Sequence, residues 1–415
     1  TGTPPPPPPP LQVYLLAGQS NMDGYAYVSG LPPSWRVAQP DVLLFWSGAP
    51  AWSALAPASY GSLYGVEYFG PEVSFGRAMA DARPDHEIAL IKHAVGGTDL
   101  ASYWAPGETR EDPAQGEGYR VFLATADAAL AELDAAGTEW ELAGMIWMQG
   151  ESDAFDPAQA EAYAGNLSRF VARVREDFEA PDLPFALGKI HCPTCTYGDT
   201  IRAGQDEVAA TVSGVTAFET TDLPIFADNI HYDGSGMRTL GQRFAQSLLG
   251  LPLSPTPTPA FALSGSFSSA YTGNFFLGYV FTVDRPITVT DLGTLDIGLD
   301  GLSLSSEVVL YEADSATILA RATVPAQASA PASPWDRWRY AALEPVDLEP
   351  GRYLVASQVY SGSADRYIHN AAITAAEGFA WVESRHKDYA SVGLPTIVSG
   401  GEASWFGPNL LVLER

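Results

Sequence analysis

Apolar residues form short consecutive runs that alternate with segments of helical periodicity over residues 11–251. Consecutive apolar positions are typical of strands that are covered on both faces. The runs that predict such strands span residues 13–17, 42–46, 88–91, 145–148, 185–190 and 215–218. Apolar residues recur at helical spacing over residues 72–83, 119–136, 157–178 and 235–249. This alternation predicts an α/β domain, in which helices cover both faces of a parallel sheet.

The pattern changes after Pro259 to short alternating segments that are separated by Gly, Asp and Pro. Strands of this kind predict an all-β sandwich domain over residues 260–415. Examples are residues 279–283, 308–311 and 352–356. We find no clustered acid, base and nucleophile in this region, so we expect the chemistry in the α/β domain.

Two proline-rich stretches flank the α/β domain. Residues 1–10 contain the unbroken run Pro4 to Pro10, which predicts an extended polyproline II linker because each ring fixes φ and removes an amide donor. Residues 252–259 form the second stretch, in which Pro alternates with Thr from Pro255 to Pro259, a pattern typical of a linker between domains. Because such linkers are common in exported multidomain proteins, we expect a secreted or periplasmic location.

The charge of the chain narrows the class of partner. In 415 residues, 49 Asp and Glu outnumber 22 Lys and Arg, which gives a formal net charge of −27 at pH 7. Such a surface repels phosphate backbones, so we expect no nucleic-acid partner. No apolar run approaches the roughly 20 residues of a membrane-spanning helix, so no membrane span is expected. The sequence starts at Thr1 without a charged and apolar leader, so any export signal is expected to be absent from it.

A candidate nucleophile follows the first predicted strand. Ser20 lies in the turn Gly18-Gln19-Ser20-Asn21, at the carboxyl edge where such sheets bind ligands. A serine hydroxyl reacts only when a base removes its proton. Asp228 and His231 stand three residues apart before the last helix, which lets the carboxylate meet one ring nitrogen while the other points elsewhere. Alone, either motif is more typical of an ordinary turn or cap.

Two further turns follow later strands, at residues 94–98 and 147–153. Glycine in such a turn allows a backbone N–H to approach a reacting oxygen, and a glutamine side chain can donate to the same oxyanion. The order of the four elements at consecutive strand ends therefore predicts a single hydrolase site.

At these residues the sequence resembles the SGNH (GDSL-like) hydrolases. Within them it resembles the sialate O-acetylesterase-like group, which includes the acetylxylan esterases of carbohydrate esterase family 6. The resemblance covers roughly residues 11–250, through residues 18–22, 96–98, 147–154 and 228–231. It implies a flavodoxin-like three-layer α/β/α domain with a parallel sheet, and a Ser-His-Asp hydrolase that removes acetyl groups from sugars.

The resemblance also implies a role for each matching residue. Ser20 is expected to be the nucleophile, His231 the general base and Asp228 the acid that orients it. The oxyanion hole is expected to comprise the amides of Ser20 and Gly97 and the side chain of Gln149. Wider SGNH enzymes commonly carry Asn where this chain has Gln149, so the glutamine selects a subgroup. Neither a metal nor a cofactor is expected.

Gln19, Asn21 and Glu151 are expected to support these residues through hydrogen bonds. Glu151 and Asp153 are also alternative carboxylates for His231. We favour the supporting role for both, because His231 already has Asp228 within one turn of chain.

Cys192 and Cys195 match the Cys-x-x-Cys pattern of thiol redox proteins. In an exported chain we favour a local disulfide that pins the loop after the strand at 185–190, with redox catalysis as the alternative.

Aromatic residues near the predicted site raise a choice between core packing and contact with sugar rings. The candidates for stacking are Trp46, Tyr103 and Trp104, and the same choice applies to residues 275–276 and 335–338 of the last domain. His93, before the first glycine turn, is a candidate for contact with the site.

We therefore predict a carbohydrate O-acetylesterase that acts on an acetylated polysaccharide or a sialic-acid-type sugar through an acyl-Ser20 intermediate. One alternative is a general short-chain carboxylesterase. The other is an inactive carbohydrate-binding or adhesion protein, against which the intact Ser20, Asp228 and His231 argue. The β-sandwich is a candidate for contact with polysaccharide.

Overall fold

The structure is a computed structural model that describes residues 9–57, 68–264, 268–271, 273–298, 301–326, 337–361, 365, 367–369, 372–388, 392–398 and 407–415. The chain divides into two compact units, with the boundary after Ser254. Two short earlier segments, Ser29–Ser34 and Pro224–Asp228, group with the later unit. Most of the predicted polyproline linker, and residues 335–336, lie outside the described residues.

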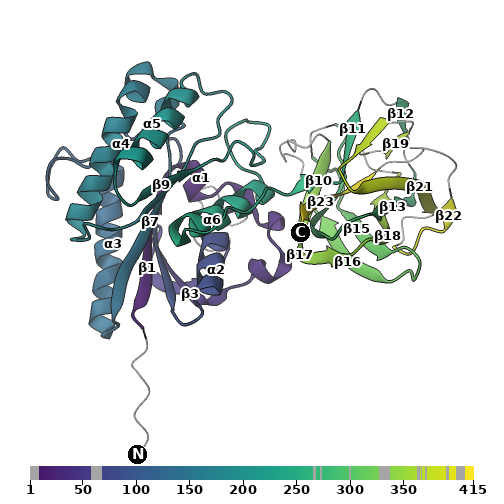
Figure 1. Cartoon of the computed structure of the whole chain (residues 1–415), viewed down its shortest axis with the longest axis horizontal. Coiled ribbons are helices and arrows are strands. Elements are labelled where there is room, and N and C mark those ends of the chain that lie inside the picture. The colour runs from purple at the N-terminus through teal and green to yellow at the C-terminus, as the bar shows by residue number, and fades with distance from the viewer. Residues whose placement is uncertain are drawn as a thin grey trace, which may run out of the picture. The chain divides into compact units, whose positions relative to one another are not determined.

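The described strands of the earlier unit form one main sheet in the order β4-β3-β6-β1-β7-β8-β9 (Figure 1). All neighbours are parallel except β3 and β4. The run β6-β1-β7-β8-β9 has the flavodoxin-like order 2-1-3-4-5 when its strands are numbered along the chain. The bounds are β1 (Leu11–Gly18), β3 (Gln39–Trp46), β4 (Ala49–Leu55), β6 (Ile88–Ala94), β7 (Trp140–Met148), β8 (Phe185–Gly188) and β9 (Val215–Phe218).

Helices cover both faces of this sheet. One face carries α2 (Glu72–Ala82) and α6 (Gly234–Leu249), as Figure 1 shows. The other face carries α3 (Glu117–Ala136), α4 (Pro157–Asp177) and α5 (Gly198–Thr211). The predicted α/β class is therefore confirmed. Shorter elements are α1 (Ser20–Asp23), η1 (Val28–Gly30), η2 (Pro33–Arg36), η3 (Asp153–Phe155) and the ribbon of β2 (Ala26–Tyr27) with β5 (Tyr68–Phe69).

Side-chain caps determine where two of the helices begin. The Asp156 carboxylate accepts hydrogen bonds from the amides of Ala158 and Gln159 at the start of α4. Asp233 caps α6 in the same way through two amides of its first turn. The helix α6 follows His231 closely, so this cap also fixes the chain that carries the predicted base.

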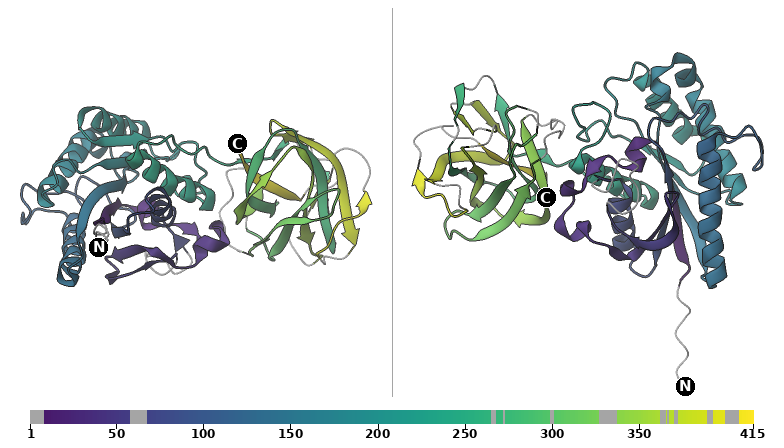
Figure 2. Two further views of the ribbon diagram at one scale, coloured as in Figure 1. Left: turned by 60° about the horizontal axis from the view of Figure 1, so that its bottom comes forward. Right: turned by 180° about the vertical axis from the view of Figure 1, so that it is seen from behind.

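The described part of the later unit consists of antiparallel strands (Figure 2). Its larger sheets have the orders β16-β15-β18-β13-β21-β22 and β10-β23-β14-β17, and smaller ribbons pair β11 with β20 and β12 with β19. Strands of both larger sheets contribute to one apolar core, which confirms the predicted all-β sandwich. Phe276 and Trp338 are fully buried, so core packing is the correct interpretation for both. The bounds are β10 (Thr258–Pro259), β11 (Phe261–Ser264), β12 (Ser268–Tyr271), β13 (Phe275–Val283), β14 (Ile287–Leu295), β15 (Ser306–Glu312), β16 (Ile318–Val324), β17 (Trp338–Leu348), β18 (Gly351–Val359), β19 (Tyr367–His369), β20 (Ala372–Ala375), β21 (Phe379–Asp388), β22 (Ile397–Val398) and β23 (Pro408–Glu414).

In the part of the chain that the structure describes, no helix is both long and apolar enough to cross a membrane.

Candidate active site

The carboxyl ends of β1, β6 and β7 meet where the strand order reverses. The Gln19 amide donates to the Met148 carbonyl at 2.9 Å, and the Val95 amide donates to the Gly18 carbonyl at 3.1 Å. Ligands bind at this position in open α/β sheets, because the connections leave the two central strands in opposite directions and open a crevice. The three predicted turns of the site therefore share one edge of the sheet.

Gly18 allows the chain to leave β1 close to β7. Its φ is +150°, and a Cβ atom built there would lie 2.0 Å from the Met148 carbonyl oxygen. A side chain cannot occupy this space without moving β7. The glycine thus permits the tight exit that places Ser20 at the start of α1.

The structure brings Ser20 and His231 together. The Ser20 Oγ lies 2.9 Å from His231 Nε2, although the two residues are 211 positions apart in the chain. Ser20 is almost fully buried, with 3% of its surface exposed. Because an imidazole that carries its proton on Nδ1 accepts through Nε2, this geometry suits the removal of the serine proton.

Asn21 fixes the backbone on both sides of His231. Its Nδ2 donates to the Ile230 carbonyl at 2.9 Å, and its Oδ1 accepts from the Tyr232 amide at 3.2 Å. The same Nδ2 donates to Glu151 Oε1 at 2.7 Å. Asn21, the residue after the predicted nucleophile, thus fixes the position of His231, the predicted base.

The Tyr25 ring lies on a face of the His231 imidazole. The two ring centroids are 4.1 Å apart and the planes differ by 23°. The chain reaches this position through Gly24, whose φ is +115° and whose Cβ, if present, would lie 2.5 Å from the Gly70 amide nitrogen. The adjacent β2–β5 ribbon then pairs Ala26 with Phe69. No pattern in the sequence indicates the contact of Tyr25 with His231, and only the glycine before Tyr25 signals the turn.

Glu151 is a buried carboxyl group beside Asn21. Burial raises its pKa, while the hydrogen bond from Asn21 and the charge of His231 act in the opposite direction. Among the described residues, its Oε2 has no hydrogen-bond partner. Because Asn21 donates to its other oxygen, Glu151 connects Asn21 to the turn after β7.

Gln149 ties the three turns together in this structure. Its Nε2 donates to Asp153 Oδ2 at 2.6 Å and to the Thr98 carbonyl at 3.0 Å. Asp153 in turn accepts from the Leu100 amide at 2.9 Å, and burial raises its pKa. Both protons of the Gln149 amide are therefore engaged with protein acceptors, so the predicted contact with an oxyanion requires one of these bonds to open.

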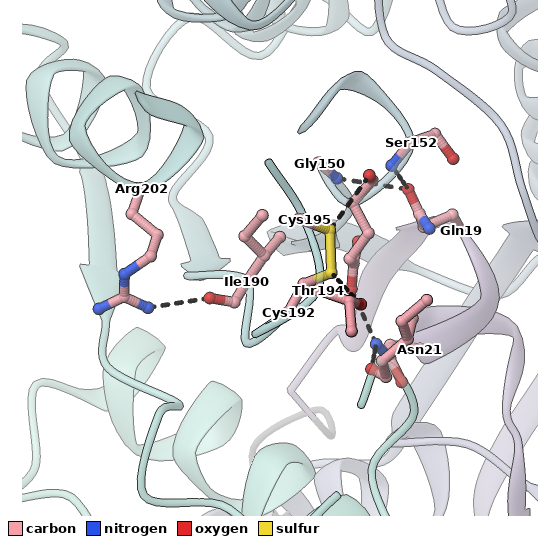
Figure 3. Close-up of a disulfide and its surroundings, with 11 residues drawn as sticks. Gln19, Asn21, Gly150, Ser152, Ile190, Cys192, Thr194, Cys195 and Arg202 are labelled. Carbon is pink, nitrogen blue, oxygen red and sulfur yellow. Dashed lines mark hydrogen bonds between the residues drawn. A yellow bond between two sulfur atoms is a disulfide. The ribbon is translucent and has the colours of Figure 1, made fainter. Parts of the chain in front are cut away.

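Gln19 completes the link between the β1 and β7 turns. Its Oε1 accepts from the Ser152 amide at 3.2 Å and from the Gly150 amide at 3.4 Å (Figure 3). Gln19, Asn21 and Glu151 thus make side-chain hydrogen bonds within this group of turns, and their supporting role in catalysis stays a prediction. Gly97 has a φ of +72°, and apart from its chain neighbours no atom of the described residues lies within 4 Å of its Cβ position. The oxyanion role of Gly97 and the orienting role of Asp228 stay predictions.

Cys192 and Cys195 form a disulfide in the loop after β8 (Figure 3). The Cys195 sulfur lies 3.6 Å from the Glu151 carbonyl oxygen. The bridged loop therefore packs against the turn that carries Gln149 and Glu151.

Trp104 and His93 pack behind the site. Trp104 is fully buried and its Nε1 donates to Thr98 Oγ1 at 2.9 Å, so a role in stacking against sugar is wrong for this residue. The His93 Nδ1 lies 2.8 Å from Ser47 Oγ, and burial lowers the pKa of His93 to about 4. Both residues support the β6 turn from within the core.

Among the described residues, no group of three or more His, Cys, Asp or Glu side chains is arranged to hold a metal ion.

A family model matches most of the earlier unit of the chain. The profile of the family described as "Carbohydrate esterase, sialic acid-specific acetylesterase" matches residues 10–250, which is more than half of the 415 residues. A probable carbohydrate esterase of Arabidopsis thaliana is 27% identical over 257 residues, which cover 57% of this chain and 90% of that protein.

Two solved structures are similar to the chain at lower identity. An X-ray structure of a protein from Arabidopsis thaliana is 23% identical and covers 58% of this chain and 99% of its own, with a TM-score of 0.48. A carbohydrate acetylesterase from Xanthomonas citri is 16% identical and covers 90% of this chain and 74% of its own, with a TM-score of 0.45. On the strength of the family match, which confirms the resemblance in the sequence, the chain belongs to this carbohydrate esterase family and is a carbohydrate O-acetylesterase.

Proposed function

We propose that the chain removes O-acetyl groups from carbohydrate as a serine esterase, with Ser20 as nucleophile and His231 as general base. The observation that supports this proposal most directly is the 2.9 Å separation of Ser20 Oγ and His231 Nε2 at the carboxyl edge of the sheet. A hydroxyl that lies against an imidazole in this way can lose its proton as it attacks.

In the first step, His231 takes the Ser20 proton while Oγ attacks the acetyl carbonyl carbon. The carbon becomes tetrahedral and its oxygen becomes negative. When this intermediate collapses, the bond to the sugar oxygen breaks and the imidazolium gives its proton to that oxygen. The deacetylated sugar leaves, and the acetyl group stays on Ser20.

In the second step, His231 takes a proton from water, whose oxygen attacks the acetyl-Ser20 carbonyl. Collapse of this second intermediate returns the proton to Ser20 Oγ and releases acetic acid, which loses its own proton to the solvent and becomes acetate. The carboxylate of Asp228 holds Nδ1 protonated throughout, so that Nε2 can accept and return protons. The Asn21 bonds to the chain around His231 keep the ring over Ser20 in both steps.

The amides of Ser20 and Gly97 stabilise the negative oxygen. Gln149 is the third donor, and it reaches the oxyanion by exchanging its bond to the Thr98 carbonyl for one to the substrate. The bond to Asp153 then holds the amide in place during this exchange. Donors of this kind are worth more in a buried site than in water.

The substrate is an acetylated polysaccharide or a sialic-acid-type sugar, and the protein is secreted or periplasmic. The family description supports the sugar acetate, and the Cys192–Cys195 disulfide supports an oxidising compartment. The later unit is a candidate for further contact with polysaccharide.

The test is acetate release from acetylated carbohydrate by the Ser20→Ala variant. We expect kcat to fall by about 10⁴- to 10⁶-fold, because the variant lacks the nucleophile. Ser213→Ala is the matched control, since Ser213 is exposed and lies on the turn before β9. Full activity of Ser20→Ala beside normal activity of the control would falsify the mechanism.

A further inference from the structure

A cavity opens beyond the carboxyl end of β8, beside the catalytic edge. Its volume is ≈ 310 Å³, at the lower end of the range of about 300–1,000 Å³ that is typical of small-molecule sites. The proposed reaction uses none of the side chains that line it. They include His191, Thr196, Asp199, Arg202, Thr221 and the Cys192–Cys195 disulfide.

His191 offers a hydrogen-bond acceptor on the wall of this cavity. Burial lowers the pKa of His191, so the neutral imidazole predominates at neutral pH. Its Nδ1 lies 3.2 Å from the Leu223 carbonyl oxygen and therefore carries the proton. This leaves Nε2 with a lone pair that can accept from a hydroxyl group.

The charges around the cavity do not favour an anion. The Arg202 guanidinium donates to the Ile190 carbonyl at 2.9 Å and is paired with the Glu219 carboxylate. Asp199 adds an exposed negative charge to the lining. A ligand in the cavity therefore meets hydroxyl, imidazole and carboxylate groups, while the charge of Arg202 is already neutralised by Glu219. This set of groups suits a neutral molecule rich in hydroxyl groups.

The cavity also offers an apolar surface. The disulfide and the exposed Pro193 contribute to the same lining as the polar groups. The C–H face of a sugar ring can lie against such a surface while its hydroxyl groups bond to the polar side. This combination matches a pyranose better than a lipid or a nucleotide.

Two contacts connect the cavity to the nucleophile. The Cys195 sulfur lies 3.6 Å from the Glu151 carbonyl oxygen, and Glu151 Oε1 lies 2.7 Å from Asn21 Nδ2, in the residue after Ser20. In Figure 3 the disulfide stands between Asn21 and the Ile190–Arg202 side of the loop. The loop disulfide therefore lines the cavity and also packs against Glu151, which is hydrogen-bonded to the residue after Ser20.

The distance between the cavity and Ser20 determines how long a ligand must be to reach both. The cavity follows β8 and Ser20 follows β1, with β7 between them in the sheet. Two strand spacings of about 4.8 Å separate β1 from β8 by roughly 10 Å. A single sugar ring is too short to fill the cavity and also present its acetyl group to Ser20.

We propose that this cavity is a subsite for a neutral pyranose residue of a glycan chain, one or more residues away from the sugar whose acetyl group is attacked. The proposal rests on the Ser20 chemistry proposed above, but binding at the subsite can be measured without catalysis. It makes the substrate an oligomer or polymer of neutral sugars, and it gives the disulfide loop a role in positioning that chain.

The test compares Thr221→Trp with Thr211→Trp. Thr221 lines the cavity and is exposed, so an indole there fills the space, whereas Thr211 is exposed at the far end of α5. Binding is measured by calorimetry on the Ser20→Ala background, with unacetylated tetrasaccharides of xylose, mannose and glucose as probes. We expect Thr221→Trp to weaken binding of at least one of them about tenfold, which corresponds to about 1.4 kcal/mol, and Thr211→Trp to leave it unchanged.

A kinetic arm separates this proposal from the proposed function. With Ser20 intact, Thr221→Trp should raise KM for an acetylated tetrasaccharide about tenfold more than KM for 4-nitrophenyl acetate. Asp199→Ala serves as a second variant that removes an acceptor without adding bulk. The subsite is overturned if Thr221→Trp and Thr211→Trp bind every probe equally, or if no neutral tetrasaccharide binds the Ser20→Ala protein. If the unaltered protein, with Ser20 intact, failed to hydrolyse 4-nitrophenyl acetate, that result would instead count against the serine mechanism.

Discussion

The imidazole of His231, the proposed general base, is held by groups that take no part in the proposed proton transfer. Asn21 fixes the backbone on both sides of His231, and Tyr25 covers one face of the ring at 4.1 Å between centroids. An aromatic face attracts a cation, so we expect Tyr25 to stabilise the imidazolium that forms in the proposed reaction. The position of the His231 ring therefore depends on Asn21, which fixes its backbone, and on Tyr25, which packs on one face of the ring.

We expect Tyr25→Leu to lower kcat by about 2- to 30-fold, the equivalent of the roughly 0.5–2 kcal/mol of a cation–π contact. KM should change less than kcat, because the ring acts on the base and not on the sugar. Tyr25→Phe keeps the aromatic face and should retain most of the activity. Steady-state kinetics with 4-nitrophenyl acetate measure all three proteins. Equal losses in the Leu and Phe variants would show that the hydroxyl, and not the ring face, is what matters.

His93 makes stability depend on pH. Burial lowers its pKa to about 4, below the ordinary value of 6.5, so the unfolded chain binds more protons between these two pH values. Stability attributable to His93 is complete above pH 6.5 and is lost as the pH falls towards 4. From pH 6.5 to pH 5 this amounts to about 2 kcal/mol. His93→Gln cannot titrate, so its melting temperature should fall less over that interval than that of the unaltered protein, as measured by thermal scans. Parallel pH profiles of the two proteins would refute this origin.

At the scale of elements, the sequence predicted the helices and strands whose apolar residues follow a clear periodic pattern. The strands at residues 13–17 and 145–148 are apolar on consecutive positions, and both lie within buried central strands of the sheet. Because the fold brings carboxyl ends of parallel strands to one edge, Ser20 and the turn at Gln149 were predictable neighbours. Helices α3 and α4 likewise begin and end within two residues of their predicted bounds.

Elements with weaker apolar patterns were missed for a physical reason. Helix α5 buries only Ile201, Gly204, Gln205 and Val208, so its apolar stripe is too narrow to stand out. Strand β4 is half-exposed along most of its length and pairs antiparallel at the edge of the sheet. The placement of Tyr25 on His231 depends on a glycine turn and a short ribbon, and periodicity carries no information about either. The same holds for the engaged amide of Gln149, since hydrogen-bond partners are set by the packed structure.

At the scale of the whole molecule, we expect the net charge to influence which substrates bind. The formal net charge of −27 gives a field that repels anionic polymers at long range. Salt screens such a field, since the Debye length falls from about 30 Å at 0.01 M to about 8 Å at 0.15 M ionic strength. The effect on binding therefore depends on the charge of the glycan.

We expect KM for an acetylated acidic polysaccharide, such as acetylated polygalacturonate, to fall severalfold as ionic strength rises from about 0.01 M to 0.15 M. Acetylated xylan is the matched neutral substrate, and its KM should stay nearly constant because an uncharged chain does not feel the field. Acetate release at constant pH measures both. If the neutral and acidic polymers responded equally to salt, the protein's charge would have no part in the choice, and the preference for a neutral chain would rest on the β8 cavity alone.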